Sequence, residues 1–314
     1  MKRVSLTAIM LAFAIIAGAG RSVAQSSGDL LQFLPDGNAV IIVDAQKVIA
    51  SSTWASLTSQ DRLKSTIDGV LKDVSELGVK LADIKTAALV FPASGWSNPT
   101  VAVNGTFNQE DLTARLRSSS QLKLTSEKYK DYDLHSITRA QAGSGSTNIS
   151  FVFYGAGTVV AGNAASVRAS IDAKTGAKPA LAQNEKLSSG LAENPSAAIR
   201  FAMEKLPGVT DRASSGQLPL PDFSSIRLIF GTVDLATGIN VNATLRNGTS
   251  EQAKNLADRL NGVLAIGQAY LKGSSDPKMA ALGDALTTVT VTGSEADAKI
   301  TGTLPAEALT LIFR

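Results

Sequence analysis

The sequence predicts an α+β protein built from two related modules of order β-α-β-β-α-β-β, with antiparallel sheets and helices packed on one face. Two observations lead to this fold class. Strand-like runs with apolar residues at every second position alternate with segments whose apolar residues recur every three or four positions. The order of these segments also occurs twice, once in residues 28–175 and again in residues 190–314.

The N-terminal segment has the layout of a secretory signal. Lys2 and Arg3 precede an apolar run from Val4 to Gly20, and the small residues of Ser22-Val23-Ala24 suit a signal peptidase. The run of about 17 residues is shorter than the roughly 20 that a membrane-spanning helix needs. We therefore expect residues 1–24 to be a cleavable signal peptide, although an uncleaved anchor is the alternative. A periplasmic or secreted protein with no transmembrane segment after cleavage is expected.

The first module begins at a turn, Leu34–Gly37, and continues into a predicted strand over Ala39–Asp44. A helix is expected over Thr58–Glu76, because its apolar residues lie three and four positions apart and Gly78 can end it. The remaining elements are predicted as strands over Ile84–Phe91 and Val101–Phe107, a helix over Asp111–Leu116, and strands over Asp133–Ile137, Ile149–Tyr154 and Thr158–Ala161.

The second module restarts after a linker predicted at Lys174–Ser189, with a strand over Ala198–Met203. The prolines within Ser214–Pro221 exclude a regular first helix there. The later elements are predicted as strands over Ile226–Phe230 and Ile239–Leu245, a helix that begins at the capping box of Thr249 and Gln252, and a hairpin of Thr287–Thr292 and Ala298–Thr303. Both modules place a Leu-x-x-Arg-Leu helix after a Val-Asn-x-Thr strand, which favours duplication over a chance match.

Several of these segments resemble a class of uncharacterised bacterial exported proteins with a duplicated α+β module. The residues that carry the resemblance are the opening of Leu34–Asp44, the helix end Leu77–Leu81, and the strands Tyr132–Ile137 and Val159–Gly162. The resemblance covers most of the chain after residue 24. It implies a duplicated fold and an envelope location, and it brings no catalytic residues.

The charge balance and the lack of cysteine argue against some partners and modifications. Three of the 30 Lys and Arg residues lie at positions 2, 3 and 21, and without them 27 basic residues balance 27 acidic ones. A nucleic-acid-binding protein needs a surplus of positive charge, so no nucleic-acid partner is expected. Because the sequence contains no cysteine, we expect neither disulfides nor a lipid anchor on an N-terminal cysteine.

No short motif predicts catalysis. Ser275–Lys278 and Lys174–Gly176 match two motifs of penicillin-recognising enzymes in the reverse order, and Asp276-Pro277 is typical of a helix start. The glycine spacing of Gly155–Gly162 indicates a hairpin turn and not a dinucleotide loop. The sole histidine, His135, lies in an alternating strand, where we expect it to face solvent. We predict no catalytic residue, no metal ligand and no cofactor, and leave open a pair of distant carboxylates.

Two segments are candidates for an interaction. Trp96 is predicted at a hairpin tip, where a large apolar side chain either binds a partner or folds back onto the sheet. The second candidate is a stiff apolar stretch that either projects or packs across the sheet: Leu218, Pro219, Leu220 and Pro221.

From these features we expect a non-enzymatic binding or structural protein of the bacterial cell envelope or extracellular space, with an envelope or extracellular protein partner. A carrier of a small apolar ligand or lipid is the alternative, and a carboxylate-dependent hydrolase is the third hypothesis.

Overall fold

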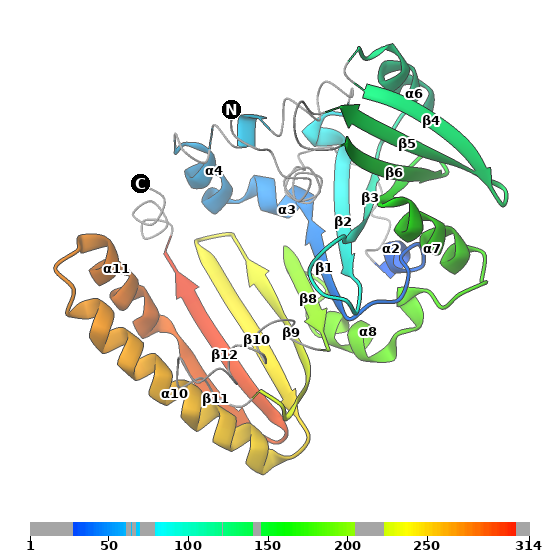
Figure 1. Ribbon diagram of the computed structural model, residues 1–314. Helices are drawn as coiled ribbons and strands as arrows, with labels where there is room; N and C mark the ends of the chain where they lie inside the picture. The colour runs from blue at the N-terminus through cyan, green and yellow to red at the C-terminus, as the bar shows by residue number, and fades with distance from the viewer. Residues whose placement is uncertain are drawn as a thin grey trace. The chain divides into compact units, whose positions relative to one another are not determined.

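The computed structural model describes residues 28–60, 64, 67–69, 79–120, 122–140, 146–204 and 223–305. It confirms an α+β protein with extensive antiparallel strand pairing and packed helices (Figure 1). The chain forms two compact units, which are described separately below. The first unit comprises the described residues of Met1–Ile49 and Ser65–Glu185, and the second those of Ala50–Lys64 and Lys186–Arg314.

The sheet of the first unit has the strand order β1-β2-β3-β7-β6-β5-β4, and every pair is antiparallel. Its strands are β1 (Ala39–Asp44), β2 (Ile84–Phe91), β3 (Thr100–Gly105), β4 (Leu122–Tyr129), β5 (Tyr132–Ala140), β6 (Ser146–Tyr154) and β7 (Thr158–Gly162). All six residues of β3 are buried. The sheet therefore needs cover on both faces, because neither side of its middle strands presents polar residues to water.

Helix α6 (Gln109–Ser118) covers one face. Leu116 packs with Phe151 and Phe153 of β6, and Leu112 joins this cluster to the apolar residues of β2 and β3. The N-terminus of α6 is fixed by Asn108, whose Oδ1 accepts a hydrogen bond from the backbone N–H of Asp111 at 3.1 Å.

Helices α2 (Gly28–Leu31) and α7 (Ala164–Lys174) lie on the opposite face. Tyr154 projects to that face and forms a hydrogen bond of 2.8 Å with Ser170 of α7, and the Ser170 hydroxyl donates to the carbonyl of Phe33. The ring of Phe33 stacks on Tyr154 with centroids 4.8 Å apart. Burial raises the pKa of Tyr154, so its hydroxyl stays protonated and remains a hydrogen-bond donor.

The hairpin between β4 and β5 is tied to α7 by Asp172, which is 8% exposed. Tyr129 donates to its carboxylate at 3.1 Å, and the ammonium groups of Lys130 and Lys178 lie 2.6 and 3.4 Å from it. The hydrogen bond from Lys130 is the main reason that the pKa of Asp172 lies below its usual value. Lys130 occupies the left-handed region (φ 53°), as the tight hairpin turn requires.

The second unit has the strand order β11-β12-β10-β9-β8, again antiparallel throughout. Its strands are β8 (Ile199–Met203), β9 (Ile226–Asp234), β10 (Ile239–Asn247), β11 (Thr290–Ser294) and β12 (Asp297–Leu304). The predicted final hairpin is confirmed as β11 and β12. Gly231 is needed where β9 passes β10, because an added Cβ would lie 2.0 Å from the carbonyl oxygen of Asn242.

Two helices cover opposite faces of this sheet. Leu256 and Ala257 of the long helix α10 (Ser250–Lys272) pack on Ile229, Leu245 and Ala298. On the other face, α8 (Glu185–Ala192) approaches so closely that a Cβ at Gly190 would lie 2.8 Å from the Cβ of Phe230. The predicted N-cap is confirmed: Thr249 accepts a hydrogen bond from the Gln252 N–H at 3.2 Å.

The structure differs from the sequence prediction before β2. Helices α3 (Ala45–Ala50) and α4 (Ser52–Thr58) occupy a segment where no helix was expected, and α4 ends where the predicted helix Thr58–Glu76 was to begin. Ser51 caps α4 by accepting from the Trp54 N–H, a start signal that the apolar pattern alone does not reveal. Ile67–Gly69 are helical, and most of the predicted helix lies outside the described residues.

Two further differences concern the first unit and its end. Strand β4 was not predicted, because an edge strand with alternating charges lacks an apolar signal. The segment predicted as a linker, Lys174–Ser189, instead contains the short helix η2 (Leu181–Gln183) and the start of α8. Residues Ala50–Lys64 belong to the second unit, in which Ser52 and Thr53 of α4 hydrogen-bond to the β9–β10 turn.

Within the described ranges, no helix combines the length and hydropathy needed to cross a bilayer.

Replacement of Asp172 by Asn is expected to lower the free energy of unfolding by about 1–2 kcal/mol at pH 7, because it removes the charge from partly buried hydrogen bonds. The matched control is Glu127→Gln, which weakens an exposed β4–α7 ion pair with Arg168 and should cost less than about 0.5 kcal/mol. Urea unfolding measures both. Because the folded pKa of Asp172 is lowered, its contribution is present above the unfolded pKa and is lost as the pH falls below about 3.8.

Candidate functional site

The structure places one of the two interaction candidates and leaves the other untested. Trp96 lies between β2 and β3, is 40% exposed, and packs edge-on against Phe91 with ring centroids 4.9 Å apart. The turn is held by Gly95 and Asn98, which both adopt positive φ, at 120° and 56°. Trp96 therefore contacts the sheet and still presents part of its ring to solvent. Leu218, Pro219, Leu220 and Pro221 lie outside the described residues.

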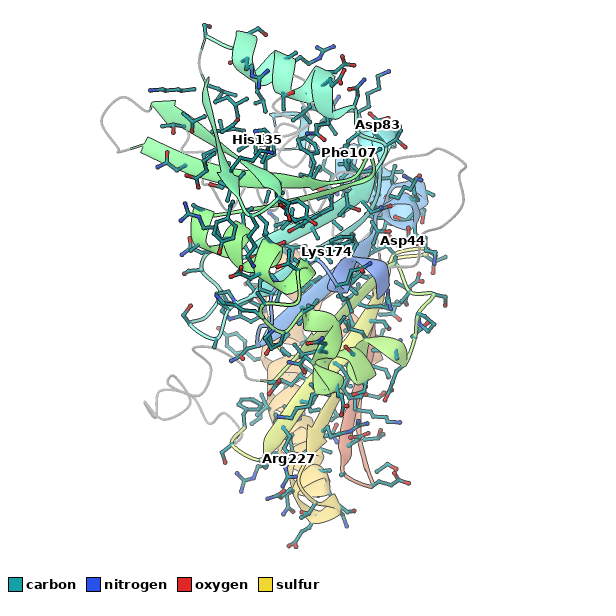
Figure 2. All side chains as sticks on the ribbon, turned by 90° about the vertical axis from the view of Figure 1, so that its right-hand side faces the viewer. Asp44, Asp83, Phe107, His135, Lys174 and Arg227 are labelled. Carbon is teal, nitrogen blue, oxygen red and sulfur yellow. The ribbon has the colours of Figure 1, made fainter. Side chains whose placement is uncertain are left out.

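The expectation that His135 faces solvent is wrong: it is buried, with 5% of its surface exposed. Strand β5 is covered on both faces, so alternation along this strand does not separate wet from dry positions. The His135 ring lies 5.0 Å from the ring of Phe151 and 6.0 Å from that of Phe153, on the face that α6 covers. Figure 2 labels it among the strands of the first unit.

His135 forms a serine–histidine contact, with Ser126 Oγ 2.7 Å from its Nδ1. In a serine hydrolase the second ring nitrogen is held by an acidic group. Here Nε2 has no hydrogen-bond partner in the described part of the chain. Burial lowers the pKa of His135; Asp133 opposes this shift and Arg117 adds to it. The contact joins opposed residues of β4 and β5, and it lacks the group that would orient a catalytic base.

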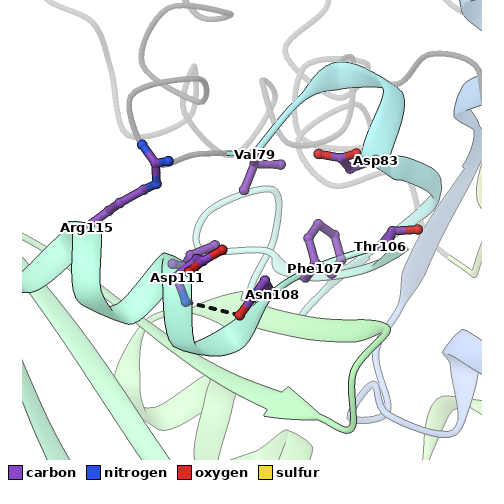
Figure 3. Close-up of a pocket in the computed structure, with 8 residues that line it drawn as sticks. Val79, Asp83, Thr106, Phe107, Asn108, Asp111 and Arg115 are labelled. Atoms are coloured by element: carbon purple, nitrogen blue, oxygen red, sulfur yellow. Dashed lines mark hydrogen bonds between the residues drawn. The ribbon is translucent and has the colours of Figure 1, made fainter.

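A small cavity of about 60 Å³ lies at the N-terminal end of α6 (Figure 3). Its lining includes the charged residues Asp83, Asp111 and Arg115, and Figure 2 also shows Asp83 near Phe107. A cavity of this size holds a few water molecules. A lipid or another apolar ligand of several hundred Å³ does not fit.

The polar groups around this cavity stabilise local backbone structure. Asp83 accepts a hydrogen bond from the Lys80 N–H at 2.9 Å, and its carbonyl accepts from the Thr106 N–H at 2.7 Å. Asp111 lies in the first turn of α6, where a negative charge complements the helix dipole. Asp83 and Asp111 therefore both line the cavity, and each also has a role in local structure: Asp83 as a backbone acceptor and Asp111 in the first turn of α6.

Two motifs have the structural roles that the sequence predicts. Asp276 caps α11 (Pro277–Ala285) by accepting from the Lys278 N–H at 2.9 Å, and Pro277 is its first residue. Gly155–Gly162 contains the β6–β7 hairpin, with Gly155 at φ 66°. Among the described residues, no group of three acidic or histidine side chains is placed to hold a metal ion.

The most distinctive surface is on α10 and was missed in the sequence. Val263, Ile266 and Tyr270 are 37%, 68% and 75% exposed, and their spacing places them along one side of the helix. We call these three residues the α10 patch. The three- and four-residue spacing of Leu256, Leu260 and Val263 predicts one buried stripe, yet Val263 is exposed. The available signal was Asn261–Leu271, eleven residues without a charge, which is more than one buried face requires.

The stability of the protein is expected to fall as the pH decreases from 7.5 to 5.5. The folded state holds His135 at a lowered pKa, so the unfolded chain binds more protons below about pH 6.5 and is favoured there. Urea unfolding across this range measures the slope. Because His135 is the only histidine, His135→Phe keeps an aromatic ring and should flatten the curve. An unchanged slope in this variant would contradict the assignment.

Trp96→Ala is expected to lower the free energy of unfolding by about 1 kcal/mol, the size of an aromatic pair interaction. Thermal and urea unfolding test this, with Trp96→Phe as the variant that retains an aromatic contact to Phe91. A loss of partner binding with unchanged stability would instead identify Trp96 as a binding residue.

No family model and no curated protein matches the chain, in agreement with a resemblance to proteins that have no family of known activity. Two solved structures are similar to this chain over most of its length. Crystal form IV of TP0453 gives a TM-score of 0.49 at 8% identity, over 90% of this chain and 95% of that chain. Crystal form I of TP0453 gives 0.46 at 9% identity, over 93% and 98%. The similarity concerns architecture and transfers no residue role or activity to this chain.

Proposed function

We propose that this protein is an exported, non-enzymatic binding protein of the bacterial cell envelope or extracellular space, and that it contacts a protein partner through the α10 patch. The observation that carries the proposal is the exposure of Val263, Ile266 and Tyr270 on one side of α10. Isolated exposed apolar residues are ordinary, whereas several on one helix face indicate a docking surface.

The composition of the patch suits protein recognition. Tyr is enriched among the residues that dominate binding energy, and Ile266 supplies a branched aliphatic side chain beside it. Burying a large apolar side chain completely contributes about 1.5–3 kcal/mol. With 68% and 75% of their surfaces exposed, Ile266 and Tyr270 retain most of that contribution for a partner.

The other two hypotheses have weaker support. A carrier needs an enclosed apolar cavity of several hundred Å³, and the cavity beside α6 is about 60 Å³, with both charged and apolar residues in its lining. A carboxylate-dependent hydrolase needs acidic groups that converge on substrate. Asp83 and Asp111 line that same small cavity, but Asp83 accepts a backbone hydrogen bond and Asp111 lies in the first turn of α6.

We also propose that residues 1–24, which lie outside the described residues, are a signal peptide that directs export and is then cleaved. We further propose that the two units derive from one duplicated module. In each unit the third strand, β3 or β10, pairs with the strand before it and with the last strand, β7 or β12. A helix follows the third strand in both units, α6 or α10. This shared order supports duplication, although the first unit has four strands after its helix and the second has two.

The proposal is tested by Ile266→Lys, with Asn255→Lys as the matched control. Both substitutions add one positive charge at an exposed position of α10, and only the first lies in the patch. We expect Ile266→Lys to reduce the amount of partner recovered from the envelope fraction at least tenfold, which corresponds to about 1.4 kcal/mol of binding energy. Quantitative mass spectrometry of proteins retained by the tagged chain measures this recovery.

Asn255→Lys should retain the partner, and both variants should keep the melting temperature because the substituted positions are exposed. Equal recovery with wild type and Ile266→Lys would overturn the proposed role of the patch.

A further inference from the structure

His135 is a buried imidazole with an unsatisfied nitrogen. Its Nδ1 lies 2.7 Å from Oγ of Ser126, a residue of the edge strand, whereas its Nε2 is buried and has no partner among the described residues. A neutral imidazole has one nitrogen without a proton, but the protonated ring carries an N–H on both nitrogens. Protonation therefore buries a positive charge and leaves the Nε2–H without an acceptor, which is costly in an apolar site.

The groups around the ring are apolar and include a helix that can move. The ring centroids of Phe151 and Phe153 lie 5.0 and 6.0 Å from that of His135. Leu116 of α6 packs on the same two phenylalanines, so α6 covers the face of the sheet on which His135 lies. Displacement of α6 would bring water to this face without breaking the pairing of β4, β5 and β6.

Helix α6 is held to the sheet by few side chains. Of its ten residues, only Thr113 and Leu116 are buried, and Leu112 is partly buried. The eleven-residue helix α7 on the opposite face buries a larger set: Val167, Ser170, Ile171, Asp172 and Ala173. A helix as short as α6 is not stable alone in water, so its release from the sheet would also open its backbone hydrogen bonds.

Charged side chains from three elements act on His135. Asp133 of β5 favours protonation, but it is already paired with Lys128 of β4 at 3.0 Å. Arg117 of α6 opposes protonation. Strand β6 contributes only uncharged side chains to this face, and the other charged residues of α6 are Glu110, Asp111 and Arg115. Release of α6 would therefore move Arg117 away from the protonated ring as well as admit water to Nε2.

We infer that protonation of His135 releases α6 from the sheet of the first unit, so that α6 is a cover that opens in mild acid. In the released state the imidazole reaches water and titrates near its ordinary pKa of about 6.5. Burial lowers the pKa of His135 in the closed state, so below about pH 6.5 the released state binds more protons and gains population. The linkage of one proton limits this gain to about tenfold for each pH unit.

This inference goes beyond the proposed function, because it concerns the first unit and does not involve the α10 patch. It also differs from a loss of overall stability in acid. Global unfolding opens α6 and α7 together and exposes much surface, so it depends strongly on urea. Local release opens α6 alone and exposes little surface, so it is almost insensitive to low concentrations of urea.

The test is amide hydrogen exchange of the full chain, followed by mass spectrometry at pH 7.5 and 5.5 in zero and low urea. We expect the opening constant of α6 at pH 5.5 to exceed that of α7 at least about tenfold and to change little with urea. The matched variant is His135→Phe, which keeps an aromatic ring and removes the titrating group. The ratio of wild-type to variant exchange in α6 cancels the intrinsic effect of pH, and it should rise about three- to tenfold between pH 7.5 and 5.5.

Two results would overturn the inference. One is a single opening constant and a single urea dependence shared by α6 and α7 at pH 5.5, which would show that acid acts through global unfolding. The other is an equal response of α6 to pH in wild type and His135→Phe, which would assign the response to another group. The urea criterion needs only the wild-type chain, so it decides the question even where the variant does not fold.

Discussion

Burial of the middle strands on both faces is the constraint on which the first unit depends. Every residue of β3 is buried, so its sheet is stable only with α6 on one side and α2 and α7 on the other. The buried polar groups follow from this arrangement. Tyr154 must place its hydroxyl between the sheet and α7, and Ser170 supplies a partner that also holds the chain at Phe33. Removing either helix layer would expose apolar strands, and removing α7 would also leave the Tyr154 hydroxyl without its Ser170 partner.

The sheet of the second unit is covered by helices less completely. Its sheet is covered by α10 on one face and by α8 over β8 and β9 on the other, where Gly190 permits close approach to Phe230. Beyond α8, the outward positions of β10 and β12 are polar, and Arg246 pairs with Asp297 across them at 2.9 Å. Those strands satisfy their solvent-facing side with polar residues. The outer side of α10 instead presents exposed apolar residues to solvent, so that helix, and not the sheet, is the candidate for binding.

The sequence was sufficient for elements whose pattern has one period and one buried side. The hairpins, the Thr249 and Asp276 caps and most strands follow from alternation and local capping chemistry. It was insufficient for the burial of single side chains on a strand covered on both faces, and for an exposed edge strand. Alternation along β5 assigns His135 to the surface, yet the side chain is buried because both faces of β5 are covered. Strand β4 lacks an apolar signal because it is an edge strand. The α10 patch does not follow from the inward stripe of apolar residues, because Ile266 and Tyr270 lie outside that stripe.

The charged pattern of β4 has a consequence for how copies of this protein meet. As the outermost strand of its sheet, β4 offers backbone donors and acceptors on one side, which is the usual template for strand addition and fibril growth. Lys123, Glu127 and Lys128 are exposed along it, and a second such strand added in parallel register would place like charges opposite one another. Intermolecular sheet extension is thereby disfavoured at this edge, which protects the protein at high local concentration.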